Sequence, residues 1–177
     1  MARWDELFAD LEGQLDAADA AELDAEVEAL QVAAWSRMAL LDRLRVAGDA
    51  ALTIVLVDGS TVRGRAEAVG PDWLLLLDGS DELLVPASAL ADVSGLPPRG
   101  EAEPSMVTQR LGLGHALRRV AADREPVLVA RLGAPPLRCR IMRVGLDHVD
   151  VAAAYEAVVP AGMKSLPFAA LLVLRRL

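Results

Sequence analysis

Four arginines are the side chains in this sequence whose type and spacing best suit binding chemistry. They are Arg131, Arg138, Arg140 and Arg143. Arg138 and Arg140 are two residues apart, so on an extended strand they share one face. Such a row of guanidinium groups binds either phosphates or an acidic protein segment. We favour the acidic segment, because residues 1–50 hold twelve acids against four bases, whereas residues 101–177 hold seven acids against eleven bases.

Groups that would suit a metal site or a nucleophile are few. His148 lies near Asp147 and Asp150, but side chains on alternate faces of a strand do not converge on one ion, so no metal site is expected. Cys139 is the single cysteine, which excludes an internal disulfide, and no histidine beside it in the sequence would activate it. No phosphate-binding loop and no serine, histidine and acid set stands out. We therefore predict a protein that is not an enzyme and needs no cofactor.

One aromatic side chain, Trp73, stands at the start of a predicted strand, directly after Pro71 and Asp72. An indole in this place either stacks on a base or a partner side chain, or closes one end of the core. We favour the core, because His148 takes the equivalent place 75 residues later.

Composition describes a folded protein of 177 residues, 54% of them apolar, with a net charge of −8. An acidic chain is a poor default binder of nucleic acid, because phosphate contacts need lysine and arginine. No apolar run is long enough for a membrane span, and the amino terminus is acidic where a secretory signal would be basic. We expect a cytoplasmic protein without a membrane partner. Seventeen arginines against one lysine suggest a GC-rich bacterial genome.

Residues 1–35 are predicted to be an acidic helical segment, either one amphipathic helix or a helical hairpin. Asp19 followed by Glu22 has the spacing of a capping box, which marks the start of a second helix. The segment either covers the rest of the protein, which we favour, or binds a partner protein. Apolar residues recur at helical spacing at Trp4, Leu7, Phe8, Leu11 and Leu15, and again at Leu23, Val27, Leu30, Ala34, Met38 and Leu41.

From residue 51 to 93 the pattern predicts five short strands. Apolar and polar residues alternate, Asp58 and Gly59 make a tight turn, and Gly64 stands in the middle of the second strand where a barrel bends. Five such strands in a flat sheet would leave exposed edges, so a small, strongly bent barrel is expected.

The strand pattern occurs twice in the sequence. Residues 126–177 align with residues 51–96 at an offset of 75, which becomes 81 after an insertion in the second copy. We predict a first barrel with a preceding helix at 36–96, a linker at 97–105, and a second barrel with a preceding helix at 106–177. The fold class is α+β and mainly β, with two five-stranded barrels of the Sm-like or SH3-like kind.

The segments "LTIVLVDGSTVRGRAEAV" and "WLLLLD" resemble the Sm-like fold and, within it, the Hfq family of bacterial RNA chaperones. That resemblance implies RNA binding, but the residues that carry it in the family are missing. Where the Hfq family has a Tyr/Phe-Lys-His signature, the first copy has Val85-Pro86-Ala87 and the second has Leu166-Pro167-Phe168. The asparagine and the Arg-Gly pair of the Sm type are not evident either.

Sm-like barrels join through their fourth and fifth strands, so the resemblance implies a homo-oligomer. The apolar segment "LPFAALLVLRRL" is the expected interaction edge, with Leu166, Phe168, Leu171 and Val173. We predict a non-catalytic interaction or scaffold protein that assembles through its helices and edge strands. The alternative is an RNA-binding post-transcriptional regulator that uses the basic face of the second barrel.

Overall fold

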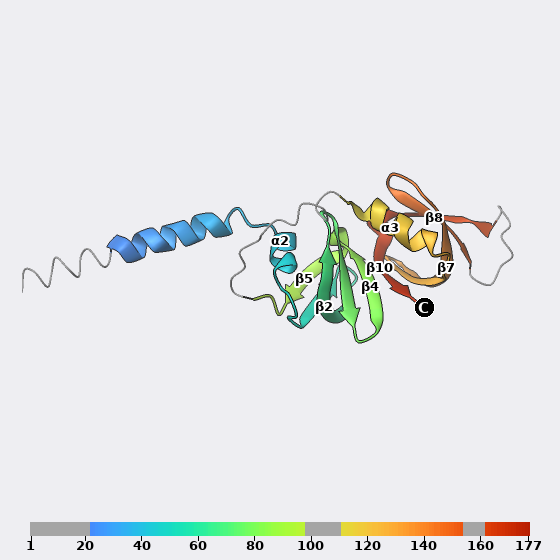
Figure 1. Cartoon of the computed structure of the whole chain (residues 1–177). Helices are drawn as coiled ribbons and strands as arrows, with labels where there is room; N and C mark the ends of the chain where they lie inside the picture. Colours follow the sequence, from blue (N-terminus) through green and yellow to red (C-terminus); the bar gives the residue numbers. More distant parts are fainter. Residues whose placement is uncertain (1–21, 98–110, 154–161) are drawn as a thin grey trace, which may run out of the picture. The chain divides into compact units, whose positions relative to one another are not determined.

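The computed structural model of the chain describes residues 22–97, 111–153 and 162–177 (Figure 1). The chain divides into two compact units, Met1–Ala39 and Leu40–Leu177. The helices of the second unit are α2 (Leu40–Arg45), α3 (Leu113–Ala122) and the 3-10 turns η1 (Ala87–Ala89) and η4 (Phe168–Ala170). Its strands are β1 (Leu52–Leu56), β2 (Thr61–Val69), β3 (Trp73–Asp78), β4 (Asp81–Pro86), β5 (Leu90–Ser94), β6 (Val127–Arg131), β7 (Ala134–Val144), β8 (His148–Ala153), β9 (Lys164–Pro167) and β10 (Leu171–Arg176).

In the first unit, residues 22–35 are helical, and the helix predicted over residues 4–15 lies outside the described residues. The apolar side chains Leu23, Val27 and Leu30 are 62%, 45% and 65% exposed. The predicted pattern ran on to Leu41, but the helix ends before Ser36, whose hydroxyl donates to the carbonyl of Ala33 at 2.9 Å. A serine that bonds to the preceding turn competes with helix continuation.

All ten strands form one antiparallel sheet in the order β5-β1-β2-β3-β4-β10-β6-β7-β8-β9. The predicted α+β, mainly-β class is confirmed. The two halves of this order are equivalent, because each begins with the fifth strand of a repeat and then follows its first four strands. The ten strands form a continuous sheet, and the closure of each half into a barrel stays a prediction.

Hydrogen bonds outside the strand ladders recur in both halves at the two sequence offsets. The amide of Gly70 donates to the carbonyl of Trp73 at 2.8 Å, and Gly145 donates to His148 at the same distance. At the 3-10 turns, the amide of Ala87 donates to Asp72 at 2.9 Å, and the amide of Phe168 donates to Asp147 at 2.7 Å. The same backbone geometry is therefore built twice, which supports the internal repeat.

Gly64 holds a backbone conformation that side chains disfavour. Its φ is +154°, and an added Cβ would lie 2.5 Å from the carbonyl oxygen of Leu77 on the neighbouring strand. Only glycine permits this close approach. The second repeat has Cys139 at the equivalent place, fully buried, and the register shift between Ala66 and Ala68 on β2 recurs between Ile141 and Arg143 on β7.

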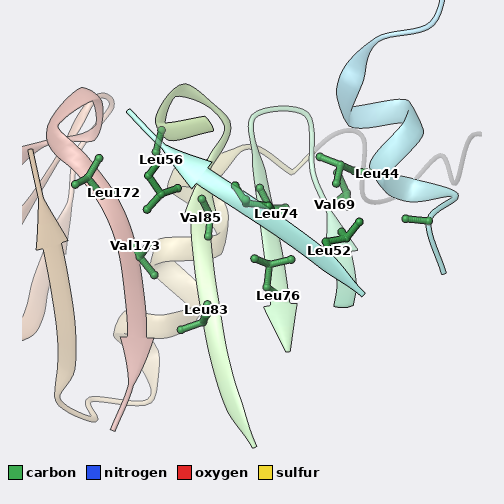
Figure 2. Packing of buried hydrophobic residues seen from close by; sticks show 13 residues of the cluster. Leu44, Leu52, Leu56, Val69, Leu74, Leu76, Leu83, Val85, Leu172 and Val173 are labelled. Carbon is green, nitrogen blue, oxygen red and sulfur yellow. The ribbon is translucent and has the colours of Figure 1, made fainter. Parts of the chain in front are cut away.

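Two apolar clusters form the core, and each takes side chains from both repeats. Leu172 and Val173 of β10 belong to the cluster of the first repeat, in which Val173 lies near Val85 of β4 (Figure 2). Trp73 of β3 and Leu84 of β4 belong to the cluster of the second repeat. Because side chains from each repeat complete the core of the other, the pair folds as one unit over Leu40–Leu177.

Each helix packs on the second strand of its own repeat, α2 on β2 and α3 on β7. Arg45 holds α2 in place, since its guanidinium donates to the carbonyl oxygens of Val69 at 3.3 Å and Gly70 at 2.8 Å. The amino terminus of α3 is capped from the other repeat. Gly112 offers no side chain, and a carboxylate oxygen of Asp72 accepts from the amide of Leu113 at 2.7 Å.

Candidate interaction edges and basic face

The seam between the repeats is a strand pairing of β4 with β10. Leu174 lies opposite Leu84, and Arg175 lies opposite Leu83. Two ion pairs cross the seam, from Arg175 to Asp81 at 2.6 Å and from Arg176 to Glu82 at 3.2 Å. The fourth strand of one repeat thus binds the fifth strand of the other within a single chain.

This pairing corrects the expectation of a free edge at "LPFAALLVLRRL". Leu171 and Val173 lie in β10, which hydrogen-bonds to β4 on one side and to β6 on the other, and both are buried. Phe168 lies in η4 and packs against the second cluster. Of the four residues named for the edge, only Leu166 lies on an outer strand, and its side chain is 7% exposed. The apolar edge is covered by the chain's own first repeat.

Among the described strands, the outer ones are β5 and β9, each of which pairs with one neighbour. They are the fifth strand of the first repeat and the fourth strand of the second, so they are the counterparts of β10 and β4. Their exposed residues include Asp92 on β5 and Lys164 on β9. A charge on an outer strand protects it from indiscriminate pairing.

The four predicted arginines are distributed between a strand face and a hairpin. Arg138, Arg140 and Arg143 are exposed on β7, where they alternate with or flank the buried Cys139 and Ile141. In the part of the chain that the structure describes, neither Arg140 nor Arg143 has an acidic side chain within 4.0 Å.

Arg131 lies apart from this row, at the end of β6. Its guanidinium donates to the carbonyl oxygen of Pro135 at 2.7 Å, while its Nε is buried without a partner. Arg131 therefore holds the β6–β7 hairpin, and the basic face consists of Arg138, Arg140 and Arg143. The acidic helix predicted to dock on this face spans residues 5–28, of which 5–21 lie outside the described residues and 22–28 belong to the other unit. The docking of this helix on the basic face stays a prediction.

Trp73 is a core residue, as expected, and it has a second role that the sequence did not predict. Its side chain is 8% exposed and lies over Gly70, while its indole N–H donates to the carbonyl oxygen of Leu111 at 2.7 Å. The indole therefore fixes the chain just before α3 and is not available to stack on a base.

Three titratable groups in the second repeat, Cys139, Asp147 and His148, have shifted pKa values. His148 Nδ1 lies 2.9 Å from a carboxylate oxygen of Asp147, and this hydrogen bond raises the pKa of His148 and lowers that of Asp147. Both side chains are solvent-exposed, so the pair contributes little to stability. Burial raises the pKa of the Cys139 thiol to about 11, which keeps it protonated and unreactive.

Among the described residues, no three histidine, cysteine or acidic side chains gather closely enough to hold one metal ion. No helix in the described ranges combines the length and the apolar character that a bilayer crossing requires.

Comparisons with protein-family models, with curated proteins and with solved structures find no match for this chain. The resemblance to the Sm-like fold stays a prediction from the sequence.

Sequence reasoning missed the residues that make the seam and its counterpart edges. The offset of 81 already placed Asp92 at the position of Val173, and Lys164 at the position of Leu83. In this alignment a charged residue in one repeat takes the place of an apolar residue in the other. The strands with the apolar residues are the buried ones, and the strands with the charged residues are the exposed ones. No such pattern predicts that Asp72 caps α3, because Asp72 and Leu113 are 41 residues apart in the sequence.

Proposed function

We propose that the protein is a non-catalytic scaffold made of two small Sm-like barrels, which assembles with further copies of itself through its outer strands. The observation that carries this proposal is the pairing of β4 with β10. A fourth strand and a fifth strand of this repeat bind each other inside the chain. The equivalent strands, β9 and β5, are left at the two ends of the sheet. A second copy that offers β5 to β9 would repeat the same contact between chains.

The internal repeat sets the register of this contact. Because Leu174 lies opposite Leu84 within the chain, the offset of 81 places Val93 of one copy opposite Ser165 of the next. Three copies joined head to tail would place six repeats in a ring. Antiparallel pairing within a dimer would not extend in this way.

The chemistry of the intermolecular contact differs from that of the seam. Within the chain, Val173 and Leu83 are apolar neighbours in the first cluster. Their counterparts at the outer strands are Asp92 and Lys164, which carry opposite charges. In the proposed register these two side chains lie on the same face of adjacent strands and form an ion pair. A polar contact of this kind is weaker than the seam, is reversible, and weakens with added salt.

A charge exchange tests the proposal. We expect sedimentation at micromolar concentration and low salt to show assembly of the unaltered chain. Asp92→Lys places lysine beside lysine and Lys164→Asp places aspartate beside aspartate, so each single change shifts the assembly towards monomer. The double variant restores opposite charges and restores assembly.

The matched control is Glu125→Lys, which changes an exposed charge outside both outer strands and is expected to leave the assembly unchanged. A chain that remains monomeric at micromolar concentration would refute assembly through strand edges. Assembly that both single variants retain would refute the proposed register, because the ion pair would then lie elsewhere.

A second candidate function, binding of single-stranded RNA, is favoured by one observation. Arg140 and Arg143 are exposed on β7, and in the described chain neither has an acidic side chain within 4.0 Å, although Asp150 lies opposite Arg143 on β8. Exposed guanidinium groups on one strand suit a phosphate-binding strip. We expect binding of a mixed oligonucleotide to weaken steeply with salt and to be lost in Arg138→Ala with Arg140→Ala. The control is Arg63→Ala with Arg65→Ala, the equivalent pair of the first repeat, where Arg65 is already paired with Glu67 at 2.9 Å. Absence of binding at low salt would exclude this function.

A further inference from the structure

A pocket of about 400 Å³ lies over the seam, between α3 and the strands β3, β4 and β10. It belongs to neither the outer strands nor the basic face. Its lining is mostly apolar, and its volume falls within the range of pockets that bind small molecules.

The floor of the pocket is a row of leucines across three strands. Leu75 of β3 lies opposite Leu84 of β4, which lies opposite Leu174 of β10. On this side of the sheet α3 packs chiefly on β7, and it presents the small side chain of Ala116 to the pocket. The helix therefore leaves part of the leucine row uncovered, and Trp73 closes one side.

Two hydrogen-bond donors stand at the mouth, one helical turn apart on α3. They are His115, which is exposed, and Arg119, whose side chain is 79% exposed. Within the described ranges, Arg119 has one ionic partner, Asp123, at 3.6 Å, whereas Arg176 binds the other oxygen of the same carboxylate at 2.8 Å. Arg119 can therefore turn to a ligand while Asp123 keeps a partner.

The charges around the mouth limit what the ligand can carry. Arg175 and Arg176 are already paired with Asp81, Glu82 and Asp123, which leaves Arg119 as the cation with the weakest contact. The lining holds one carboxylate, that of Glu82, and Arg119 is the lining arginine whose carboxylate partner is farthest, at 3.6 Å. A ligand with a single negative charge therefore matches this arrangement better than a doubly charged phosphate.

We propose that this pocket binds a small carboxylic acid, with its apolar body on the leucine row and its carboxylate bound by Arg119 and His115. The volume suits an unbranched or aromatic body of about ten carbon atoms. The inference is independent of the scaffold function, because the pocket residues and the outer strands do not overlap.

Trp73 provides the readout. In a chain carrying Trp4→Phe and Trp35→Phe, tryptophan emission comes from Trp73 alone. We expect decanoate, added below its critical micelle concentration, to change this emission, and we expect the change to saturate as the decanoate concentration rises. Octanoate should bind about fifteenfold more weakly, because it is two methylenes shorter and each buried methylene strengthens binding about fourfold. Decanol should bind more weakly than decanoate, because it lacks the charge that Arg119 binds.

Two variants locate the ligand. Arg119→Gln should weaken decanoate binding about five- to tenfold, while Arg118→Gln, an exposed neighbour that does not line the pocket, should leave it unchanged. Ala116→Phe should fill the pocket and abolish binding, with circular dichroism confirming that the fold is kept. If that variant does not fold, the comparison of Arg119 with Arg118 still decides the outcome.

Three results would overturn the proposal. An emission of Trp73 that decanoate does not change would show that the pocket does not take this ligand. Equal binding of decanol and decanoate would remove the role of the carboxylate. Equal effects of Arg119→Gln and Arg118→Gln would show that any attraction is a general effect of charge on α3.

Discussion

At the scale of single residues, equivalent positions in the two repeats hold different side chains for physical reasons. Gly64 permits a strand contact that no side chain would allow, whereas Cys139 fills the same place as a buried thiol. Trp73 and His148 both lie over a glycine, but only the indole also donates to the chain before α3. The two repeats share the backbone geometry at these positions, and they differ in the contacts that the side chains make.

Substitution of Gly64 tests the close approach of β2 to β3. We expect Gly64→Ala to lower the free energy of unfolding by about 2–3 kcal/mol, because its Cβ would meet the carbonyl oxygen of Leu77 in a strained conformation. Denaturant unfolding measures this loss. The control is Gly59→Ala, which has a positive φ of 82° but open space around it, and it should cost about 1 kcal/mol. Equal losses in both variants would contradict the role of the contact.

At the scale of elements, α3 depends on residues of the other repeat. Its first turn begins at two glycines that provide no cap, and Gly lowers helix propensity. Asp72 supplies the cap, Trp73 fixes Leu111, and the buried Leu117 anchors the helix in the second cluster. In the described part of the chain, α3 begins at Leu113, directly after these contacts.

The cap can be removed without disturbing the core. We expect Asp72→Ala to lower the free energy of unfolding by about 1–2 kcal/mol, because the amide of Leu113 loses its acceptor. Asp72→Asn keeps an oxygen acceptor and should cost less than about 0.5 kcal/mol. Thermal unfolding followed by circular dichroism distinguishes the two. A full loss in the asparagine variant would show that charge, rather than the hydrogen bond, stabilises the helix start.

At the scale of the whole molecule, the two repeats form one compact unit, Leu40–Leu177, and we expect this unit to unfold cooperatively. Side chains of β10 complete the first cluster, and Trp73 and Leu84 complete the second. Cross-seam ion pairs add to this contact but are half exposed, so most of its free energy comes from apolar burial.

A cavity in the seam should therefore destabilise both repeats together. Leu172 is 1% exposed within the cluster of the first repeat, and we expect Leu172→Ala to cost about 3 kcal/mol. The emission of Trp73 and the reactivity of the buried Cys139 thiol should report one shared transition. Leu146→Ala, at a side chain that is 94% exposed, should change stability by less than about 0.5 kcal/mol. Two separate transitions would contradict a cooperative pair.

The sequence by itself determined the local secondary structure. The alternation of apolar residues, the turn at Asp58 and Gly59, the bend at Gly64 and the two offsets predicted the strands and their repetition, because these features depend on neighbouring residues. The sequence could also predict that "LPFAALLVLRRL" needed a partner, since a bare apolar strand is unfavourable.

Only the tertiary structure decided what that partner is. The chain uses its own β4 to cover β10, and it thereby leaves the charged strands β5 and β9 at the ends of the sheet. The cap from Asp72, the indole bond to Leu111 and the pocket below Arg119 likewise join residues far apart in the chain. Such contacts depend on how the two repeats are placed against each other, and no local pattern in the sequence encodes that placement.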